Sequence, residues 1–329
     1  MKLLSFSDRG AALAEGFAAA FPGATHTCAH GTEGFSLRAW TAAAFAEEDA
    51  LVFVGAAGIA VRAIAPFVQS KTTDPAVVAV DECGRFVLPL LSGHLGGANA
   101  LAEQLAALCG GTAVITTATD CHGLFAVDSW AKTQGLLISN PEAIKAVSAK
   151  LLSGETVYGR SPWRISGAPP HGVLLTEEDG WDFALTVRQR DGDGLGLIPP
   201  ILVLGIGCRR GTTTEAIETA FQSLLRENRL CEQAICLVCS IDLKEKEPGL
   251  LEFCDRHALP FQTFSAGDLQ EVAGTFSASP FVESVTGVSN VCERSAVRGS
   301  GGTLLVKKTA GNGVTMAVAQ RPFFPDWRV

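Results

Sequence analysis

The residues with the clearest capacity for chemistry lie in one short segment, Ser92-Gly93-His94-Leu95-Gly96-Gly97-Ala98-Asn99. It precedes an alanine- and leucine-rich stretch, 98–108, that predicts a helix. Glycines in such a loop leave backbone N–H groups free at a helix N-terminus, where they stabilise anions and developing oxyanions. His94 adds a group that exchanges protons near neutral pH. An ordinary loop that leads into a helix has the same composition, so the pattern fits a catalytic and a structural role equally well.

Charged side chains surround this loop in the predicted order of elements. A strand is expected at 51–54, a hairpin at 77–80 and 86–89 with its turn at 81–84, and another strand at 114–117. Because the carboxyl ends of parallel strands meet at one edge of a sheet, we expect some of these side chains to converge on a single cleft. The charged residues at the strand ends and in the loops are Arg62, Lys71, Asp74, Asp81, Glu82 and Asp120.

Strands and helices alternate along the chain, and many of the 35 glycines follow β-branched apolar runs. This pattern predicts an α/β fold with buried strands and ligands bound at strand ends. We expect an N-terminal parallel-sheet α/β domain at 1–125, a smaller mixed middle region with a linker at 126–200, and a separate C-terminal α/β domain at 201–329. The run at 139–142, with its polar cap and proline, predicts a helix start in the middle region.

Composition excludes several classes of protein. The 329 residues are 47% hydrophobic and 18% charged, which is enough to build large cores and excludes a disordered chain. Acidic residues number 34 against 26 basic ones, so we expect no nucleic-acid partner. The longest apolar run, 50–61, is shorter than the roughly 20 residues that cross a membrane. No export signal is recognisable at the N-terminus, so we expect a cytoplasmic protein with reduced cysteines and no membrane association.

Two further patterns resemble ligand-binding motifs, but neither meets the requirements of its motif. Gly205 and Gly207 follow a strand and precede a helix, yet Arg210 occupies the third glycine position of a dinucleotide fingerprint. Cysteines at 231, 236 and 239 have a ferredoxin spacing, but they lie on an apolar strand that cannot wrap a cluster. We therefore expect no nucleotide site, and no metal site either at these cysteines or at the histidines and cysteine of 26–30.

Taken in order, these motifs resemble the CbiG family, the cobalt-precorrin-5A hydrolases of anaerobic cobalamin biosynthesis. The resemblance covers both outer thirds of the chain, and the 92–99 loop is its most specific motif. The matching segments are 52–62, 71–75, 80–81, 92–99, 116–120, 205–211 with Glu215, 289–296 and 317–319.

The resemblance implies a reaction on a cobalt-containing, ring-contracted tetrapyrrole that carries a δ-lactone. Water opens the lactone, and a two-carbon fragment then leaves as acetaldehyde while the macrocycle accepts the electron pair. Because the substrate itself is the electron sink, no organic cofactor and no protein-bound metal are implied, and the cobalt arrives with the substrate. A ligand of this size is expected to bind between domains.

The same resemblance suggests roles for individual residues. His94 is the expected proton-transfer group, with Asp81 or Asp120 orienting it, and the N–H groups around Gly93, Gly96 and Gly97 are expected to stabilise the oxyanion. Basic side chains are expected to bind the substrate carboxylates. The basic candidates are Arg62, Lys71, Arg209 and Arg210. The other residues assigned to substrate binding are Gly55, Gly58, Ser92 and Asn99.

Two alternatives stay open at this point. A non-catalytic carrier would bind the tetrapyrrole and pass it between pathway enzymes, using the basic residues of the C-terminal part, and it would release no acetaldehyde. A nicotinamide-dependent oxidoreductase would rest on the incomplete glycine motif alone. The resemblance also leaves open a homodimer and transient contact with neighbouring pathway enzymes.

Overall fold

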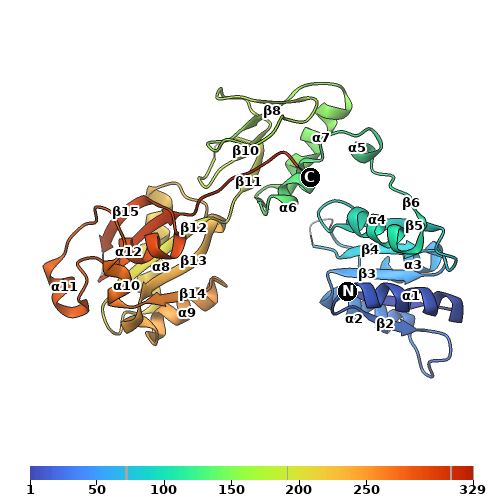
Figure 1. Ribbon diagram of the computed structural model, residues 1–329, viewed down its shortest axis with the longest axis horizontal. Helices are drawn as coiled ribbons and strands as arrows, with labels where there is room; N and C mark the ends of the chain where they lie inside the picture. Colours follow the sequence, from blue (N-terminus) through green and yellow to red (C-terminus); the bar gives the residue numbers. More distant parts are fainter. Residues whose placement is uncertain (71–72, 191, 312, 329) are drawn as a thin grey trace.

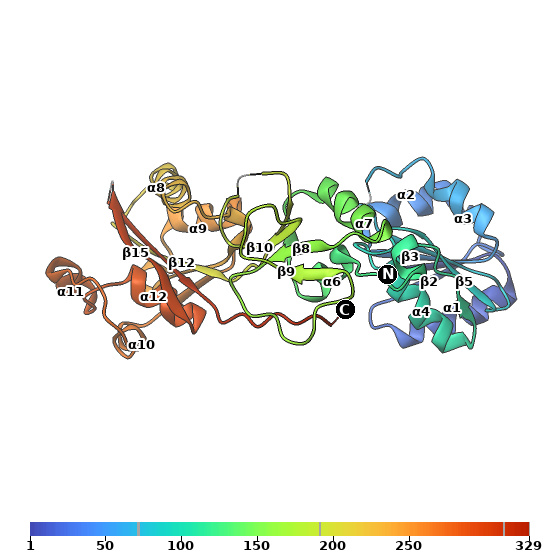
Figure 2. The same cartoon turned by 90° about the horizontal axis from the view of Figure 1, so that it is seen from above.

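The computed structural model describes residues 1–70, 73–190, 192–311 and 313–328, and these residues form three sheets arranged one after another along an elongated molecule (Figures 1 and 2). The first sheet lies at one end and the third at the other, with the second between them. The last residues of the chain run back from the third sheet to the second. None of the described helices is both long enough and apolar enough to cross a membrane.

The N-terminal sheet is covered by helices on both faces. Its strands, in spatial order, are β2 (Thr25–Cys28), β1 (Lys2–Ser5), β3 (Ala50–Val54), β4 (Ala76–Val80), β5 (Phe86–Leu91) and β6 (Thr112–Ala113). The helices on one face are α1 (Asp8–Ala20) and α4 (Ala98–Cys109), and those on the other are α2 (Leu37–Glu47) and α3 (Ala57–Ile64). Strands β3 and β4 are buried on both faces, as their uninterrupted apolar sequences predict.

Strand β5 determines where the 92–99 loop lies. Strands β1 to β4 are parallel, but β5 returns antiparallel to β4 through the predicted hairpin, and β6 is parallel to β5. The carboxyl ends of β5 and β6 therefore lie at the edge where β3 and β4 begin. The α/β class is confirmed, whereas the strand predicted at 114–117 is wrong, because β6 ends at Ala113 and the chain then leaves the sheet.

The middle region combines three helices with a small sheet. Its strands, in spatial order, are β7 (Leu137–Ile138), β11 (Leu195–Ile198), β10 (Phe183–Leu185), β8 (Val157–Arg160) and β9 (Val173–Leu175). Its helices are α5 (Ala118–Cys121), α6 (Val127–Thr133) and α7 (Ile144–Leu152). Trp130 is fully buried in this core and stacks on Trp327 of the C-terminal tail, with ring centroids 5.0 Å apart. The tail thus completes the core of the middle region.

The helix start predicted at 139–142 is displaced. A 3₁₀ turn spans Pro141–Ala143, and α7 begins only at Ile144. The Asn140 side chain does not cap this turn. Its amide oxygen instead accepts a hydrogen bond from the Gly196 backbone N–H, at 2.8 Å, and ties the turn to β11.

The C-terminal sheet is also covered on both faces. Its strands, in spatial order, are β14 (Phe261–Phe264), β13 (Ile235–Ile241), β12 (Leu202–Cys208), β16 (Val314–Gln320) and β15 (Thr303–Gly311). Helices α8 (Thr214–Glu227) and α9 (Pro248–Arg256) cover one face of the sheet, and α12 (Cys292–Ser300) covers the other. Helix α10 (Ala266–Gln270) packs beside α12, and α11 (Pro280–Thr286) lies at the outer end of the molecule (Figure 1). A side chain at Gly205 would collide with the Cys292 carbonyl, so this glycine serves the packing of α12 on β12.

Candidate functional site

The 92–99 loop brings His94 between two carboxylates. The His94 Nε2 atom lies 2.9 Å from Asp120 Oδ2, and its Nδ1 atom lies 3.3 Å from Asp128 Oδ1. Asp120 belongs to α5, and Asp128 lies in the first turn of α6. Because the loop follows β5 and Asp128 belongs to the middle region, this cluster connects the first two parts of the molecule.

The local sequence holds the loop in a compact turn. Ser92 has a left-handed backbone, with φ of 57°, and its hydroxyl donates to the Asp74 carbonyl at 2.9 Å. A side chain at Gly96 would collide with Ser92, so only glycine permits this close approach. The Ala98 N–H donates to the Ser92 carbonyl at 3.1 Å and closes the turn at the start of α4. His94 is therefore presented by a rigid loop.

Both carboxylates favour the charged form of His94. The hydrogen bond to Asp128 is the largest effect and raises the pKa of His94, and the contact with Asp120 raises it further. Burial lowers this pKa, but the net result is a pKa of about 9. Burial is the largest single effect on Asp128 and raises its pKa, but the hydrogen bond and charge interaction with His94, together with backbone hydrogen bonds, outweigh burial and lower the pKa overall. At neutral pH the cluster is thus an imidazolium between two carboxylates. His94 can donate a proton or stabilise negative charge, but it is not a free base.

Asn99 positions the more exposed of the two carboxylates. Its Nδ2 group donates to Asp120 Oδ2 at 2.8 Å and to Thr117 Oγ1 at 3.0 Å. The Asp120 side chain is 34% exposed and that of His94 13%. Asp120 is therefore held by two donors at one oxygen while the carboxylate still reaches solvent.

Of the three glycines expected to form an oxyanion hole, two have backbone donors that no other described residue uses. The Gly97 N–H donates to the His94 carbonyl at 3.0 Å and is already used. Within the described part of the chain, the N–H groups of Gly93 and Gly96 make no hydrogen bond. These two groups are the remaining donors for an anion in the loop.

Sequence reasoning missed two charged residues near the loop. Asp128 pairs with His94, and the Lys132 ammonium lies directly against Gly97. Both belong to α6, so they reach the loop only through the docking of the middle region on the N-terminal domain. The only available signal was their placement on one helix, four residues apart, where two side chains share a face.

Several predicted site residues lie at the opposite edge of the sheet. Asp81 accepts hydrogen bonds from Cys83 N–H at 2.9 Å and Phe86 N–H at 2.6 Å in the β4–β5 turn. The β4–β5 ladder separates this turn from Ser92, so the prediction that Asp81 orients His94 is wrong, because β5 reverses direction.

The other predicted substrate-binding residues fall into separate groups. Gly55 and Gly58 lie at the carboxyl end of β3 and the start of α3, and Arg62 donates to the Gly58 carbonyl at 3.3 Å. Arg209 and Arg210 are exposed and follow β12 in the C-terminal domain. That domain and the N-terminal domain lie at opposite ends of the molecule (Figures 1 and 2). Lys71 lies outside the described residues. The described members of this set therefore do not share a single cleft.

The cysteine pattern has a structural explanation. Cys231, Cys236 and Cys239 carry free thiols, and burial raises the pKa of Cys239 to about 12. Among residues 1–70, 73–190, 192–311 and 313–328, no three His, Cys, Asp or Glu side chains form a group suited to a metal ion.

Comparison with known proteins adds family context to this geometry. The family model "Cobalamin synthesis G N-terminal" matches residues 39–120, and "Cobalamin synthesis G C-terminus" matches 202–319. The first includes His94 and Asp120 but ends before Asp128.

Two curated relatives span most of the chain. A cobalt-precorrin-5A hydrolase from Salmonella typhimurium is 36% identical over 290 residues, which cover 84% of this chain and 83% of the relative. One from Priestia megaterium is 32% identical over 311 residues, covering 88% and 83%. A solved structure of a cobalamin biosynthesis protein G homologue from Sulfolobus solfataricus aligns with 98% of this chain and 97% of its own, at a TM-score of 0.40 and 22% identity.

Proposed function

Because the chain belongs to the CbiG family, we propose that it hydrolyses cobalt-precorrin-5A by opening its δ-lactone and releasing acetaldehyde. The observation that carries this proposal is the 36% identity with the Salmonella cobalt-precorrin-5A hydrolase over 84% of the chain. The His94 cluster supports it, because lactone opening requires proton transfers at an ester and a site for the resulting oxyanion.

In the proposed first step, the Asp120 carboxylate takes a proton from water as the water oxygen bonds to the lactone carbonyl carbon. The Gly93 and Gly96 N–H groups stabilise the oxyanion. The lactone C–O bond then breaks, and the His94 imidazolium protonates the departing alkoxide. Asp120 returns its proton to His94 across their 2.9 Å contact, so the cluster regains its starting charge.

In the proposed second step, the freed hydroxyl loses its proton to the Asp120 carboxylate. The adjacent C–C bond breaks, its electron pair enters the conjugated macrocycle, and the two-carbon fragment leaves as acetaldehyde. The proton passes from Asp120 to solvent or to the reduced macrocycle. No organic cofactor is needed, because the substrate accepts the electrons, and this reaction is a carbon–carbon bond hydrolysis overall.

The test is anaerobic incubation of the protein with the lactone substrate, with acetaldehyde and the mass of the corrinoid product followed together. We expect both to appear in equal amounts. A product that keeps the two-carbon fragment after lactone opening would limit the activity to the first step. Binding of the substrate with neither product nor aldehyde would contradict catalysis and favour the carrier function.

A further inference from the structure

A pocket lies where the middle region meets the C-terminal domain, apart from the His94 cluster. It has a volume of about 570 Å³. Arg160, Thr176 and Thr186 lie at or just beyond the ends of β8, β9 and β10, which are parallel strands. Leu305 and Gln320 close it from β15 and β16. Carboxyl ends of parallel strands are a common place for ligands, and this volume is typical of small-molecule sites.

The pocket is basic although the whole chain has a net charge of −8. Arg160, Arg188 and Arg190 line it together with one carboxylate, Glu177. Arg188 and Arg190 pair with no carboxylate among the described residues, and Arg160 reaches only the fully exposed Asp179, at 3.5 Å. Three guanidinium groups with this little internal compensation favour a ligand with several negative charges.

The arginines are held in place by neutral groups. Arg190 donates to the Gly194 carbonyl at 2.6 Å and lies over the Trp181 ring, 5.0 Å from its centroid. Arg188 donates to the Asn228 carbonyl at 2.5 Å, which bridges the middle region and the C-terminal domain. Their donors are therefore oriented before a ligand arrives, which reduces the entropy lost on binding.

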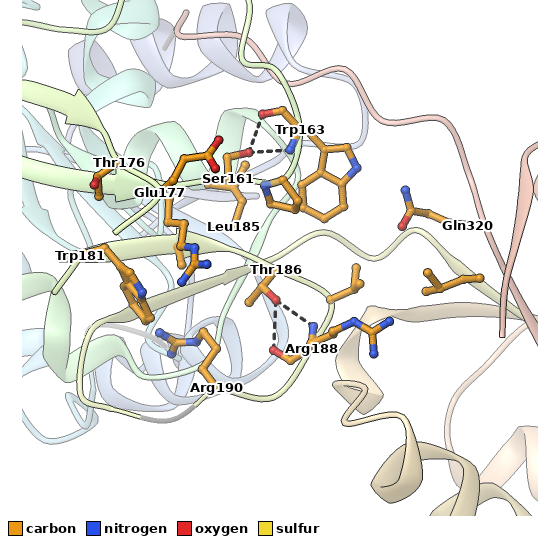
Figure 3. Close-up of a pocket in the computed structure, with 15 residues that line it drawn as sticks. Ser161, Trp163, Thr176, Glu177, Trp181, Leu185, Thr186, Arg188, Arg190 and Gln320 are labelled. Atoms are coloured by element: carbon orange, nitrogen blue, oxygen red, sulfur yellow. Dashed lines mark hydrogen bonds between the residues drawn. The ribbon is translucent and has the colours of Figure 1, made fainter. Parts of the chain in front are cut away.

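Two tryptophans give the pocket flat apolar walls. Trp181 and Trp163 lie on either side of Leu185 and Thr186 (Figure 3). Trp163 packs edge-on against Phe323, with centroids 5.3 Å apart, and the Ser161 hydroxyl accepts from its backbone N–H at 3.1 Å. Fixed indole rings beside arginines suit a planar conjugated ligand with carboxylates on its rim.

We propose that this pocket is a binding site for the carboxylate-rich rim of the tetrapyrrole, an identification that rests on the proposed function. Arg160 and Arg188 bind the rim carboxylates, Arg190 adds positive charge at the Trp181 side, and the indole rings contact the macrocycle. The pocket, with a volume of about 570 Å³, holds only part of so large a ligand.

The test uses cobalt uroporphyrin, a planar cobalt tetrapyrrole with a carboxylate-rich rim, titrated into the full chain while tryptophan fluorescence is followed. We expect Arg188→Gln and Arg160→Gln each to weaken binding about tenfold, because each removes a charge-assisted hydrogen bond. Arg188→Lys keeps the charge but loses the planar fork, so we expect a smaller loss. Arg226→Gln, on the exposed surface of α8, is the matched control and should leave the dissociation constant unchanged.

Two further measurements keep this proposal separate from the proposed function. His94→Ala should leave uroporphyrin binding unchanged, and circular dichroism shows whether each arginine variant is folded. If folded Arg160→Gln and Arg188→Gln variants, and the variant combining both, bind as tightly as the unmodified protein, the pocket proposal is overturned even if acetaldehyde is formed. If these variants lose binding while the unmodified protein forms no acetaldehyde, the pocket proposal stands and catalysis is rejected.

Discussion

Two histidines in this protein have nearly the same carboxylate partners but different surroundings. His94 lies between Asp120 and Asp128, and His257 lies between Glu218 and Glu232, with both contacts at 2.7 Å. For His257, burial lowers the pKa, but the two glutamates outweigh it and raise the pKa overall. Pairing an imidazole with two carboxylates therefore favours the imidazolium at both places.

The surroundings decide what each imidazolium can do. His257 follows the last residue of α9 and packs against the rings of Phe221 and Phe253, with centroids 5.2 and 4.6 Å away. A cation at a helix C-terminus stabilises the helix. His94 instead lies in a glycine loop where two N–H groups have no hydrogen-bond partner among the described residues, and it joins two parts of the molecule. Contact with two carboxylates alone therefore does not indicate a catalytic histidine. The glycine loop around His94 is the feature that distinguishes it from His257.

The largest expected effect is on turnover. His94→Ala should lower acetaldehyde release by about 100-fold or more, the usual contribution of a proton-transfer residue, with little change in substrate binding. His257→Ala is the matched control and should leave turnover unchanged while lowering stability. The measurement is acetaldehyde formation under single-turnover conditions together with the substrate dissociation constant. If His94→Ala and His257→Ala lost turnover equally, the two histidines would not differ in role. The same would follow if His94→Ala weakened substrate binding as much as it lowered turnover.

The next effect concerns the pH dependence of turnover. In the unmodified protein, His94 should keep its proton up to a pH of about 9, so turnover should fall only as the pH rises through that value. Asp128→Asn removes the partner that contributes most and should move this alkaline limb toward pH 6.5. The position of the limb is measured from pH–rate profiles and by NMR titration of the imidazole. An alkaline limb that stays in place in Asp128→Asn would show that another group controls it.

Local elements of the site follow from the sequence, but their assembly does not. The hairpin around Asp81 and the helix after the 92–99 loop are predicted correctly, because turn residues and apolar periodicity are local signals. The pairing of His94 with Asp128 depends on the docking of α6, which no local pattern encodes.

The direction of one strand explains the main error about the site. The sequence indicates a hairpin, and a hairpin makes its two strands antiparallel. The inference that charged side chains at the strand ends converge on one cleft treats the strands as parallel, and it allows Asp81 to lie beside His94. The structure separates them by the length of the β4–β5 ladder. The basic pocket of the middle region was missed for another reason, since Arg160 ends β8 while Arg188 and Arg190 follow β10, and these two segments share no motif.

A smaller effect is expected on stability at alkaline pH. The folded pKa of His94, about 9, is raised above the ordinary value of 6.5, so its contribution is complete below pH 6.5 and is lost as the pH rises through about 9. This shift corresponds to about 3 kcal/mol at most. Denaturant unfolding of the unmodified protein and of His94→Gln at pH 6.5 and 9.5 measures it. We expect the two free energies of unfolding to differ at pH 6.5 and to converge at pH 9.5; a constant difference would contradict the ion-pair explanation.

The smallest expected effect is that of Asp81→Ala, and it tests whether the two sheet edges are independent. The Asp81 carboxylate accepts from two backbone N–H groups of the β4–β5 turn, so its loss should lower the free energy of unfolding by about 1 kcal/mol. Turnover should stay unchanged, because this turn lies at the edge opposite His94. Asp120→Ala is the matched comparison and should lower turnover strongly, since it removes the proposed proton acceptor. If Asp81→Ala reduced turnover as much as Asp120→Ala, the reacting part of the substrate would have to reach the carboxyl edge of β4, and the assignment of catalysis to the 92–99 loop would fail.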